Sequence, residues 1–164
     1  MIQQNLIKVG MADLNIATEG AVLKTTGLGS CVGLTLFDPI RKVAGMAHVM
    51  LPSSDIARET KMNLAKYADT AIPELLDRMV AAGAYIERMK AKMAGGAQMF
   101  AMSGHSDSLR IGPRNVESCI EMLHKFKIPI LAQDTGGSFG RTIEFDSTNG
   151  LLSIRSVQFG IKEI

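Results

Sequence analysis

Short hydrophobic runs separated by Gly, Asp and Pro fill the first fifty residues of the chain. Residues of this type in runs of this length favour strands, and the intervening residues favour turns. The pattern predicts strands in NLIKVG (5–10), DLNIA (13–17), AVLKT (21–25), CVGLTLFD (31–38) and KVAGMAHVML (42–51). Pro39 suits the second position of a type I turn, so the last two runs are expected to form a hairpin.

The spacing of apolar residues changes to a helical period between Leu64 and Ala84. We expect Pro73 to kink or delay this helix. A second helix is predicted from Pro113, because proline is favourable in a first helical turn. The expected apolar stripes are Leu64, Ala68, Ile72, Leu75, Leu76, Met79 and Val80 in the first helix, and Val116, Ile120, Leu123 and Phe126 in the second.

Strand patterns return at the C-terminal end, in IPILAQD (128–134), RTIEFDS (141–147) and LLSIRSV (151–157). The Asn-Gly of TNG between the last two favours a hairpin turn. KAKMAGGAQMF (90–100) is expected to be a strand interrupted at Gly95 and Gly96. With no internal repeat and no linker, residues 1–164 are interpreted as one α/β domain, a mixed and largely antiparallel sheet with packed helices.

Composition narrows the choice of partners and compartment. The chain is 46% hydrophobic and 164 residues long, enough to bury a core without disulfides or a metal. A net charge of +2, spread along the chain, and an aromatic content of 5% disfavour a nucleic-acid-binding role. The sequence shows neither a secretory signal nor an apolar run that would insert into a membrane. We therefore expect a cytoplasmic protein with two free thiols.

The predicted hairpin brings a cysteine and a histidine to one face. If Asp38 lies opposite Arg41 or Val43, Cys31 and His48 share a face and lie directly opposite or diagonally, within side-chain reach of each other. A bulge or a slip of one residue would separate them. The other face is wholly apolar and holds Val32, Leu34, Leu36, Val43, Gly45, Ala47, Val49 and Leu51.

A thiol beside an imidazole indicates more than either residue alone. Each would ordinarily be a buried core residue. Together they are typical of an activated cysteine nucleophile, with the histidine expected to hold the thiolate as an ion pair. The polar segment TTGLGS before Cys31 offers backbone N–H groups, so Gly29 and Ser30 are candidates for an oxyanion-binding or substrate-binding loop, together with the N–H of Cys31 itself.

Other chemistry-bearing residues are interpreted as structural. Cys119 is expected in the core of the second helix, and His124 on its solvated surface. His105, in SGHSDS, is either a surface residue or a substrate or metal contact. The spacing of histidines and cysteines does not match a zinc site. DTGGSFGR and MAGGA do not match a nucleotide-binding fingerprint and are interpreted as tight turns lining a cleft, so no metal and no cofactor is expected.

Five segments in order, TTGLGSCVGLTLFD, GMAHVMLP, KMAGGAQMF, IGPRN and AQDTGGSFGRTIEFDSTNG, resemble motifs of the CheD family of bacterial chemoreceptor glutamine deamidases. The resemblance runs from about residue 20 to residue 157. It implies an α/β sandwich similar to the catalytic domains of deamidating toxins. It also implies a catalytic set of cysteine, histidine and threonine, which falls on Cys31, His48 and Thr25. Thr26 departs from the family pattern, which tends towards an apolar or aromatic residue there.

The resemblance implies hydrolysis of glutamine side chains on methyl-accepting chemotaxis receptors to glutamate and ammonia. Cys31 would form a thioester, His48 would transfer protons, and Thr25 would orient the imidazole. The implied partners are these receptors and a CheC-type chemotaxis phosphatase, and the implied location is the chemoreceptor array. Some family members are also credited with receptor methylesterase activity.

Two other functions are compatible with the same residues. One is a cysteine hydrolase of another class, acting on esters or as a transglutaminase, since only the leaving group and the acceptor would differ. The other is a non-enzymatic chemotaxis adaptor that binds the receptor or the phosphatase. Product analysis distinguishes the first from a deamidase, and the relative reactivity of Cys31 and Cys119 distinguishes the second.

Overall fold

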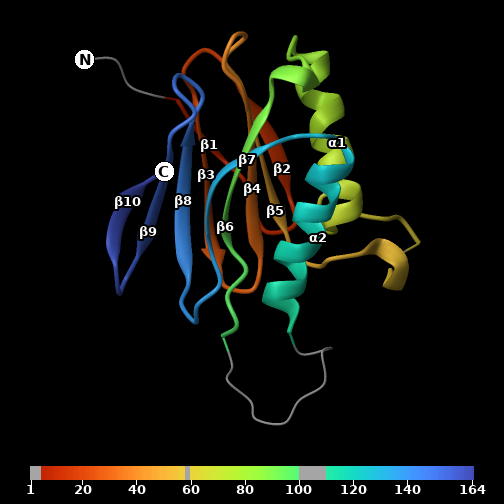
Figure 1. The fold of residues 1–164 in the computed structure, drawn as a ribbon, viewed down its shortest axis with the longest axis vertical. Coiled ribbons are helices and arrows are strands. Elements are labelled where there is room, and N and C mark those ends of the chain that lie inside the picture. The colour runs from red at the N-terminus through yellow and green to blue at the C-terminus, as the bar shows by residue number, and fades with distance from the viewer. Residues whose placement is uncertain (1–4, 58–59, 100–109) are drawn as a thin grey trace.

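Two central strands, β4 (Val32–Asp38) and β5 (Val43–Val49), are buried along their whole length. A strand that is buried on both faces must be covered on both sides. In the computed structural model, which describes residues 5–57, 60–99 and 110–164, helices cover one face and a second sheet covers the other (Figure 1). The result is a layered α/β sandwich, as expected from the sequence, with two sheets where the strand pattern alone suggested one.

Counted over the described residues, each sheet has five strands and is largely antiparallel. The helix-covered sheet has the order β2 (Leu14–Ala17), β5, β4, β6 (Lys90–Gly95), β7 (Ile130–Thr135), with β6 and β7 parallel. The outer sheet has the order β1 (Leu6–Lys8), β3 (Val22–Leu28), β8 (Arg141–Asp146), β9 (Leu152–Ser156), β10 (Gly160–Glu163), with β1 and β3 parallel. The predicted hairpin through TNG is confirmed by the antiparallel pairing of β8 with β9. The strand β10 was not predicted.

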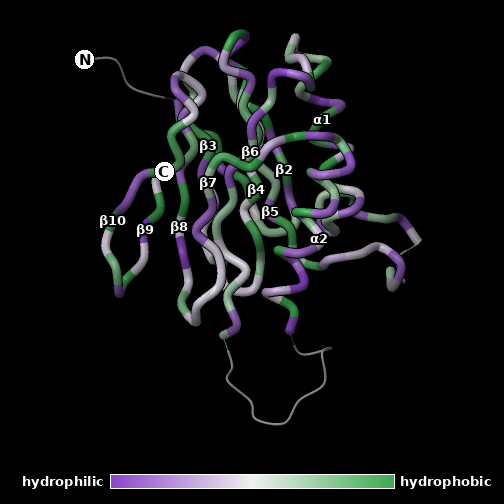
Figure 2. The backbone as a smooth tube through the Cα atoms, in the orientation of Figure 1, coloured by the Kyte–Doolittle hydropathy of each residue, from purple (hydrophilic) through white to green (hydrophobic). Residues whose placement is uncertain are grey.

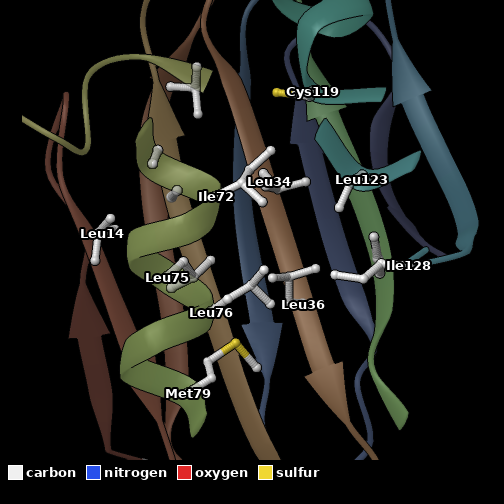
Figure 3. Packing of buried hydrophobic residues seen from close by; sticks show 14 of the residues in the cluster. Leu14, Leu34, Leu36, Ile72, Leu75, Leu76, Met79, Cys119, Leu123 and Ile128 are labelled. Atoms are coloured by element: carbon white, nitrogen blue, oxygen red, sulfur yellow. The ribbon is translucent and has the colours of Figure 1, made fainter. Parts of the chain in front are cut away.

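The helix α1 (Ala68–Ala81) places Ile72, Leu75, Leu76 and Met79 in one core with Leu34 and Leu36 of β4 (Figure 3), and its Leu75 and Met79 lie over Gly45 of β5. Two residues of its predicted stripe are exposed, Leu64 at 43% and Val80 at 45%, so that part of the prediction was wrong. Leu64 precedes the helix, because Tyr67 is still extended and forms a parallel bridge with Leu51. The buried stripe of the helix includes Ala71, which was not predicted, and does not include Val80. Pro73 lies inside the helix.

The helix α2 (Ile111–Lys125) buries Leu123 of the predicted stripe, whereas the buried Asn115 and Cys119 each precede a predicted position by one residue. Its buried residues are Gly112, Asn115, Cys119 and Leu123, whereas Val116, Ile120 and Phe126 pack at the edge of the core. The expected core position of Cys119 is confirmed (Figure 3). A Cβ atom on Gly112 would lie 2.1 Å from the Ala97 carbonyl oxygen, so only glycine allows α2 to approach the end of β6 this closely.

A second core fills the space between the two sheets. Its members include Leu23, Leu28, Phe37, Met46, Ile143, Phe145, Leu152 and Ile154. Hydrophobic and hydrophilic residues alternate along β8 because one side of that strand faces this core (Figure 2). No helix within the described residues has the length and apolar character needed to cross a membrane.

The remaining elements are two short 3₁₀ helices, η1 (Ser54–Ile56) and η2 (Ile86–Arg88), found within the described residues. The first of them lies in the segment between β5 and α1, and the second precedes β6. Neither was predicted, since a single turn has too few residues for a recognisable hydrophobic period.

Candidate active site

The register of β4 and β5 sets the position of the candidate base. Asp38 lies opposite Val43, which is one of the two expected registers, and Gly33 therefore lies opposite His48. Cys31 immediately precedes β4, two residues before Gly33, so it lies diagonally from His48. Both side chains are buried, and Cys31 belongs to the core between the sheets. The structure thus brings the predicted thiol and imidazole to the same face of the sheet.

Thr25 reaches the imidazole from the opposite sheet. It lies in β3 and is 2% exposed, and its Oγ1 atom is 2.7 Å from Nδ1 of His48. This hydrogen bond joins β3 of the outer sheet to β5 of the helix-covered sheet. When the ring proton is on Nδ1, the Nδ1–H group donates to Oγ1 and Nε2 keeps a lone pair. The neighbouring Thr26 is exposed, so the structure distinguishes the two adjacent hydroxyl groups.

A bulge in β3 follows Thr25. Thr25 lies opposite Ile143 and Leu28 lies opposite Arg141, so three steps on β3 match two steps on β8. Gly27 occupies the bulge with a φ of 72°, in the left-handed region that favours glycine. Because of the extra residue, Thr25 and Leu28 both face the space between the sheets while Thr26 and Gly27 are exposed. The chain then turns to Cys31 and enters the other sheet.

Burial favours the neutral forms of the thiol and the imidazole. Burial raises the pKa of the Cys31 thiol, and a hydrogen bond from the residue's own backbone N–H opposes this in lesser degree. Burial lowers the pKa of His48, whose Nε2 atom has no hydrogen-bond partner among the described residues. Both shifts favour the neutral forms, so they do not support the expected ion pair. A neutral imidazole with a free lone pair is a proton acceptor.

The loop before Cys31 is held by its carbonyl groups. The Gly29 carbonyl accepts from Ala97 N–H over 2.8 Å, and the Cys31 carbonyl accepts from Gly96 N–H over 2.8 Å. Gly29 N–H donates to the Gly27 carbonyl, so of the two loop candidates only Ser30 has an uncommitted N–H. Neither Ser30 nor Cys31 donates its backbone N–H to another described residue.

One glycine-rich segment, MAGGA, lies against this loop, and the other, DTGGSFGR, lies against MAGGA. A Cβ atom on Gly95 would lie 2.3 Å from the Cys31 carbonyl oxygen, and Gly95 has a φ of 106°. The Gly136 N–H donates to the Gly95 carbonyl over 3.0 Å, which links DTGGSFGR to MAGGA. The prediction of tight turns was wrong for MAGGA, because Met93–Gly95 belong to β6, and Gly96 and Ala97 after the strand support the Cys31 loop by donating to its carbonyl groups.

Asn115 was not predicted as part of the site. It is fully buried, and its Nδ2 group donates to the carbonyl oxygens of Ser30 and Met50. The signal was present in the sequence, because Asn115 is a polar residue four positions before Cys119 on the buried side of a helix. A buried amide needs hydrogen-bond partners, and here they are the segments that carry Cys31 and His48.

The other candidates lie away from this site or outside the described residues. Cys119 is fully buried among apolar residues, and burial raises its pKa to about 12. His124 is exposed, as expected. His105 lies outside the described residues. Within the part of the chain that the structure describes, no group of three or more His, Cys, Asp or Glu residues is placed to hold a metal ion.

These features define a class of protein, an α/β sandwich with a buried thiol and a threonine-bound imidazole at the seam between two sheets. The family model for CheD chemotactic sensory transduction matches residues 50–156. The chain is 54% identical over 160 residues to the chemoreceptor glutamine deamidase CheD of Halalkalibacterium halodurans, covering 98% of this chain and 99% of the relative. It is 48% identical over 159 residues to the protein of that name from Bacillus subtilis, covering 97% and 96%. The chain belongs to the CheD family.

Among solved structures, the chain is similar to the Bacillus licheniformis hypothetical protein YfiH. The TM-score is 0.50 at 13% identity, and the match covers 77% of this chain and 51% of that one. The chain therefore spans about half of that protein, and the likeness concerns the fold alone.

Proposed function

We propose that this protein hydrolyses the side-chain amide of selected glutamine residues on methyl-accepting chemotaxis receptors, producing glutamate and ammonia. Membership of the CheD family and relatives named chemoreceptor glutamine deamidase support the substrate and the reaction. The observation that carries the mechanism is the 2.7 Å contact between Thr25 Oγ1 and His48 Nδ1, which leaves Nε2 of a buried imidazole available beside the face of Cys31.

In this proposal Cys31 is the nucleophile and His48 is the general base. The Cys31 Sγ atom attacks the carboxamide carbon while Nε2 of His48 takes the thiol proton. The tetrahedral intermediate collapses when the imidazolium protonates the leaving nitrogen, which departs as ammonia and leaves a thioester. His48 then takes a proton from the water that attacks the thioester and returns it to the leaving sulfur, which regenerates the thiol and releases a glutamate side chain. The neutral resting pair fits this role, because the proton moves only as the sulfur attacks.

Thr25 and the Cys31 loop have supporting roles in the same proposal. By accepting from Nδ1–H, Thr25 selects the tautomer in which Nε2 is the proton acceptor. The N–H groups of Ser30 and Cys31, which donate to no other described residue, are the candidate donors to the oxyanion, and a donor of this kind commonly contributes about 3 kcal/mol to the transition state. Gly29 contributes to the shape of the loop through its carbonyl group.

The test of the proposal is a comparison of the two cysteines. Receptor cytoplasmic fragments are incubated with wild type, Cys31→Ala and Cys119→Ala, and ammonia release and the glutamine-to-glutamate mass shift are measured. Cys31→Ala should lose activity by orders of magnitude while remaining folded, and Cys119→Ala should stay active. Release of ammonia by the Cys31 variant at nearly the wild-type rate would exclude the mechanism. A crosslink formed together with ammonia, without the glutamine-to-glutamate mass shift, would indicate a transglutaminase, and release of an alcohol from an ester without ammonia would indicate an esterase.

We further propose, on the family resemblance, that a CheC-type phosphatase binds this protein and that the protein works at chemoreceptor arrays. Binding of the phosphatase at the active site would slow alkylation of Cys31. A fluorescent fusion should colocalise with the receptors, and an even distribution through the cell would contradict that location.

A further inference from the structure

Asn115 is a buried polar side chain that contacts both segments of the candidate active site. Its Nδ2 group donates to the Ser30 carbonyl over 2.9 Å and to the Met50 carbonyl over 3.0 Å. Ser30 directly precedes Cys31, and Met50 follows His48 by two residues. One carboxamide therefore joins the loop of the proposed nucleophile to the end of the strand that carries the proposed base.

These hydrogen bonds begin where the pairing of the two strands ends. β4 and β5 pair as far as Val32 and Val49. In a continued ladder Leu51 would lie opposite Ser30 and donate to its carbonyl, because hydrogen-bonded pairs alternate along antiparallel strands. Instead Leu51 N–H donates to the Lys66 carbonyl over 3.0 Å. Asn115 provides the donor that Ser30 would otherwise lack.

The hydrogen bond to Ser30 also sets the direction of the next N–H group. In a planar trans peptide, the carbonyl oxygen and the amide hydrogen point in opposite directions. Since the Ser30 carbonyl points at Asn115 on α2, the Cys31 N–H points away from α2. That N–H lies beside the sulfur of its own residue, which is the side from which Cys31 would attack a carbonyl carbon.

The Nδ2 group of Asn115 donates two hydrogen bonds, whereas its Oδ1 atom accepts none from the described residues. The Oδ1 atom is buried without a partner among the described residues. An apolar side chain of similar size would avoid this unsatisfied acceptor, but it would leave the Ser30 and Met50 carbonyl groups without this donor. What an apolar residue could not supply is a donor to the Ser30 carbonyl.

We propose that Asn115 is a positioning residue that holds the Cys31 N–H in the direction required to stabilise the oxyanion of the tetrahedral intermediate. This inference rests on the proposed deamidation and adds a residue to its machinery. Asn115 itself does not touch the substrate. It acts through the peptide group that joins Ser30 to Cys31.

The test separates oxyanion stabilisation from reactivity of the thiol. Asn115→Leu removes the donor, and Asn115→Asp, which keeps the side-chain shape, guards against a leucine variant that fails to fold. Ser118→Ala is the matched control, because Ser118 lies on the same helix and donates to a backbone carbonyl, that of Pro52, over 2.6 Å. Folding is checked by circular dichroism, kcat and KM are measured on receptor fragments, and the alkylation rate of Cys31 is measured with iodoacetamide.

Both Asn115 variants should lose about 10- to 100-fold in kcat, the cost expected of a misplaced catalytic group, with KM changed by less than about twofold. Alkylation of Cys31 should be unchanged within about twofold, because attack on iodoacetamide forms no oxyanion. Ser118→Ala should keep its kcat. A folded Asn115 variant with wild-type kcat would overturn the inference. So would a proportional fall in kcat and alkylation rate, since Asn115 would then act on the thiol or on the fold.

A failure of the proposed deamidation can be distinguished experimentally from a failure of the proposed role of Asn115. If wild type released no ammonia from receptor fragments, the deamidation would be rejected, and the role of Asn115 would be measured with p-nitrophenyl acetate, which acylates a thiol through an oxyanion. Slower acylation in both variants at unchanged alkylation would then support the positioning role, and equal acylation rates would reject it.

Discussion

Replacing Thr25 with valine removes one hydroxyl group and almost no volume, so it isolates the hydrogen bond to His48. A neutral hydrogen bond contributes about 0.5–1.5 kcal/mol, but a buried partner left unsatisfied costs about 1–3 kcal/mol. The larger range applies, because both residues are buried and Nδ1 would have no other partner among the described residues. For a chain of 164 residues we expect the Tm to fall by about 2–4 °C per kcal/mol.

The effect on activity should be of matching size. Without Thr25 the imidazole is no longer held in the tautomer that accepts at Nε2, and a loss of about 1–3 kcal/mol in the transition state lowers kcat by about 5- to 150-fold. Thr26→Val is the control, because that side chain is exposed and a surface change of this kind costs less than about 0.5 kcal/mol. Thermal unfolding and ammonia release are measured for both variants. A severe defect in Thr26→Val beside a normal Thr25→Val would refute the assignment.

Further predictions concern titration, labelling and backbone space. Burial lowers the pKa of His48 below 6.5, so the contribution of His48 to folding stability is fully present above pH 6.5 and is lost as the pH falls below 6.5. The Tm of His48→Gln should therefore vary less than the Tm of wild type between pH 7.5 and 5. Cys119, with a pKa of about 12, should resist iodoacetamide in the native protein and react only after denaturation, and labelling at the rate of Cys31 would contradict its core position. Gly95→Ala should lower the free energy of unfolding by at least about 2 kcal/mol and slow deamidation more than Gly33→Ala does. At Gly95 the new Cβ meets the Cys31 backbone at a positive φ, whereas at Gly33 it meets only the side-chain ends of Ile143 and Leu28. Equal effects of the two substitutions would count against this reasoning.

The pairing of Cys31 with His48 could be predicted because strand parity is a local property. One face of the hairpin was wholly apolar, and a slip by one residue would have moved the apolar residues of one strand to the other face, so the sequence favoured one alignment of faces. The short turn around Pro39 limited the possible registers to two, and the structure has the one with Asp38 opposite Val43. Both candidate residues therefore followed from alternation alone, and their diagonal arrangement was one of the two expected geometries.

The partner of the imidazole could not be derived in the same way. Thr25 belongs to β3, which pairs in the outer sheet, and nothing in its local pattern indicates which sheet a short strand joins. The bulge between Thr25 and Leu28 also changes the parity of β3, so alternation counted back from Cys31 would place Gly27 rather than Leu28 on the inward side. Thr25 was assigned from the family resemblance, and the hydrogen bond to His48 now gives that assignment a geometry.

The location of the site explains why it draws on so many parts of the chain. Cys31 lies in the connection between the two sheets, so its loop takes part in neither ladder and its carbonyl groups need donors from elsewhere. Gly96 and Ala97 supply two of these donors from the end of β6, and Asn115 supplies the third from α2. Three fixed carbonyl groups leave the intervening N–H groups pointing the other way, because each peptide is planar. The two sheets and the covering helix α2 thus place backbone N–H groups that donate to no other described residue beside the Cys31 thiol. None of these elements contributes a charged residue to the described site.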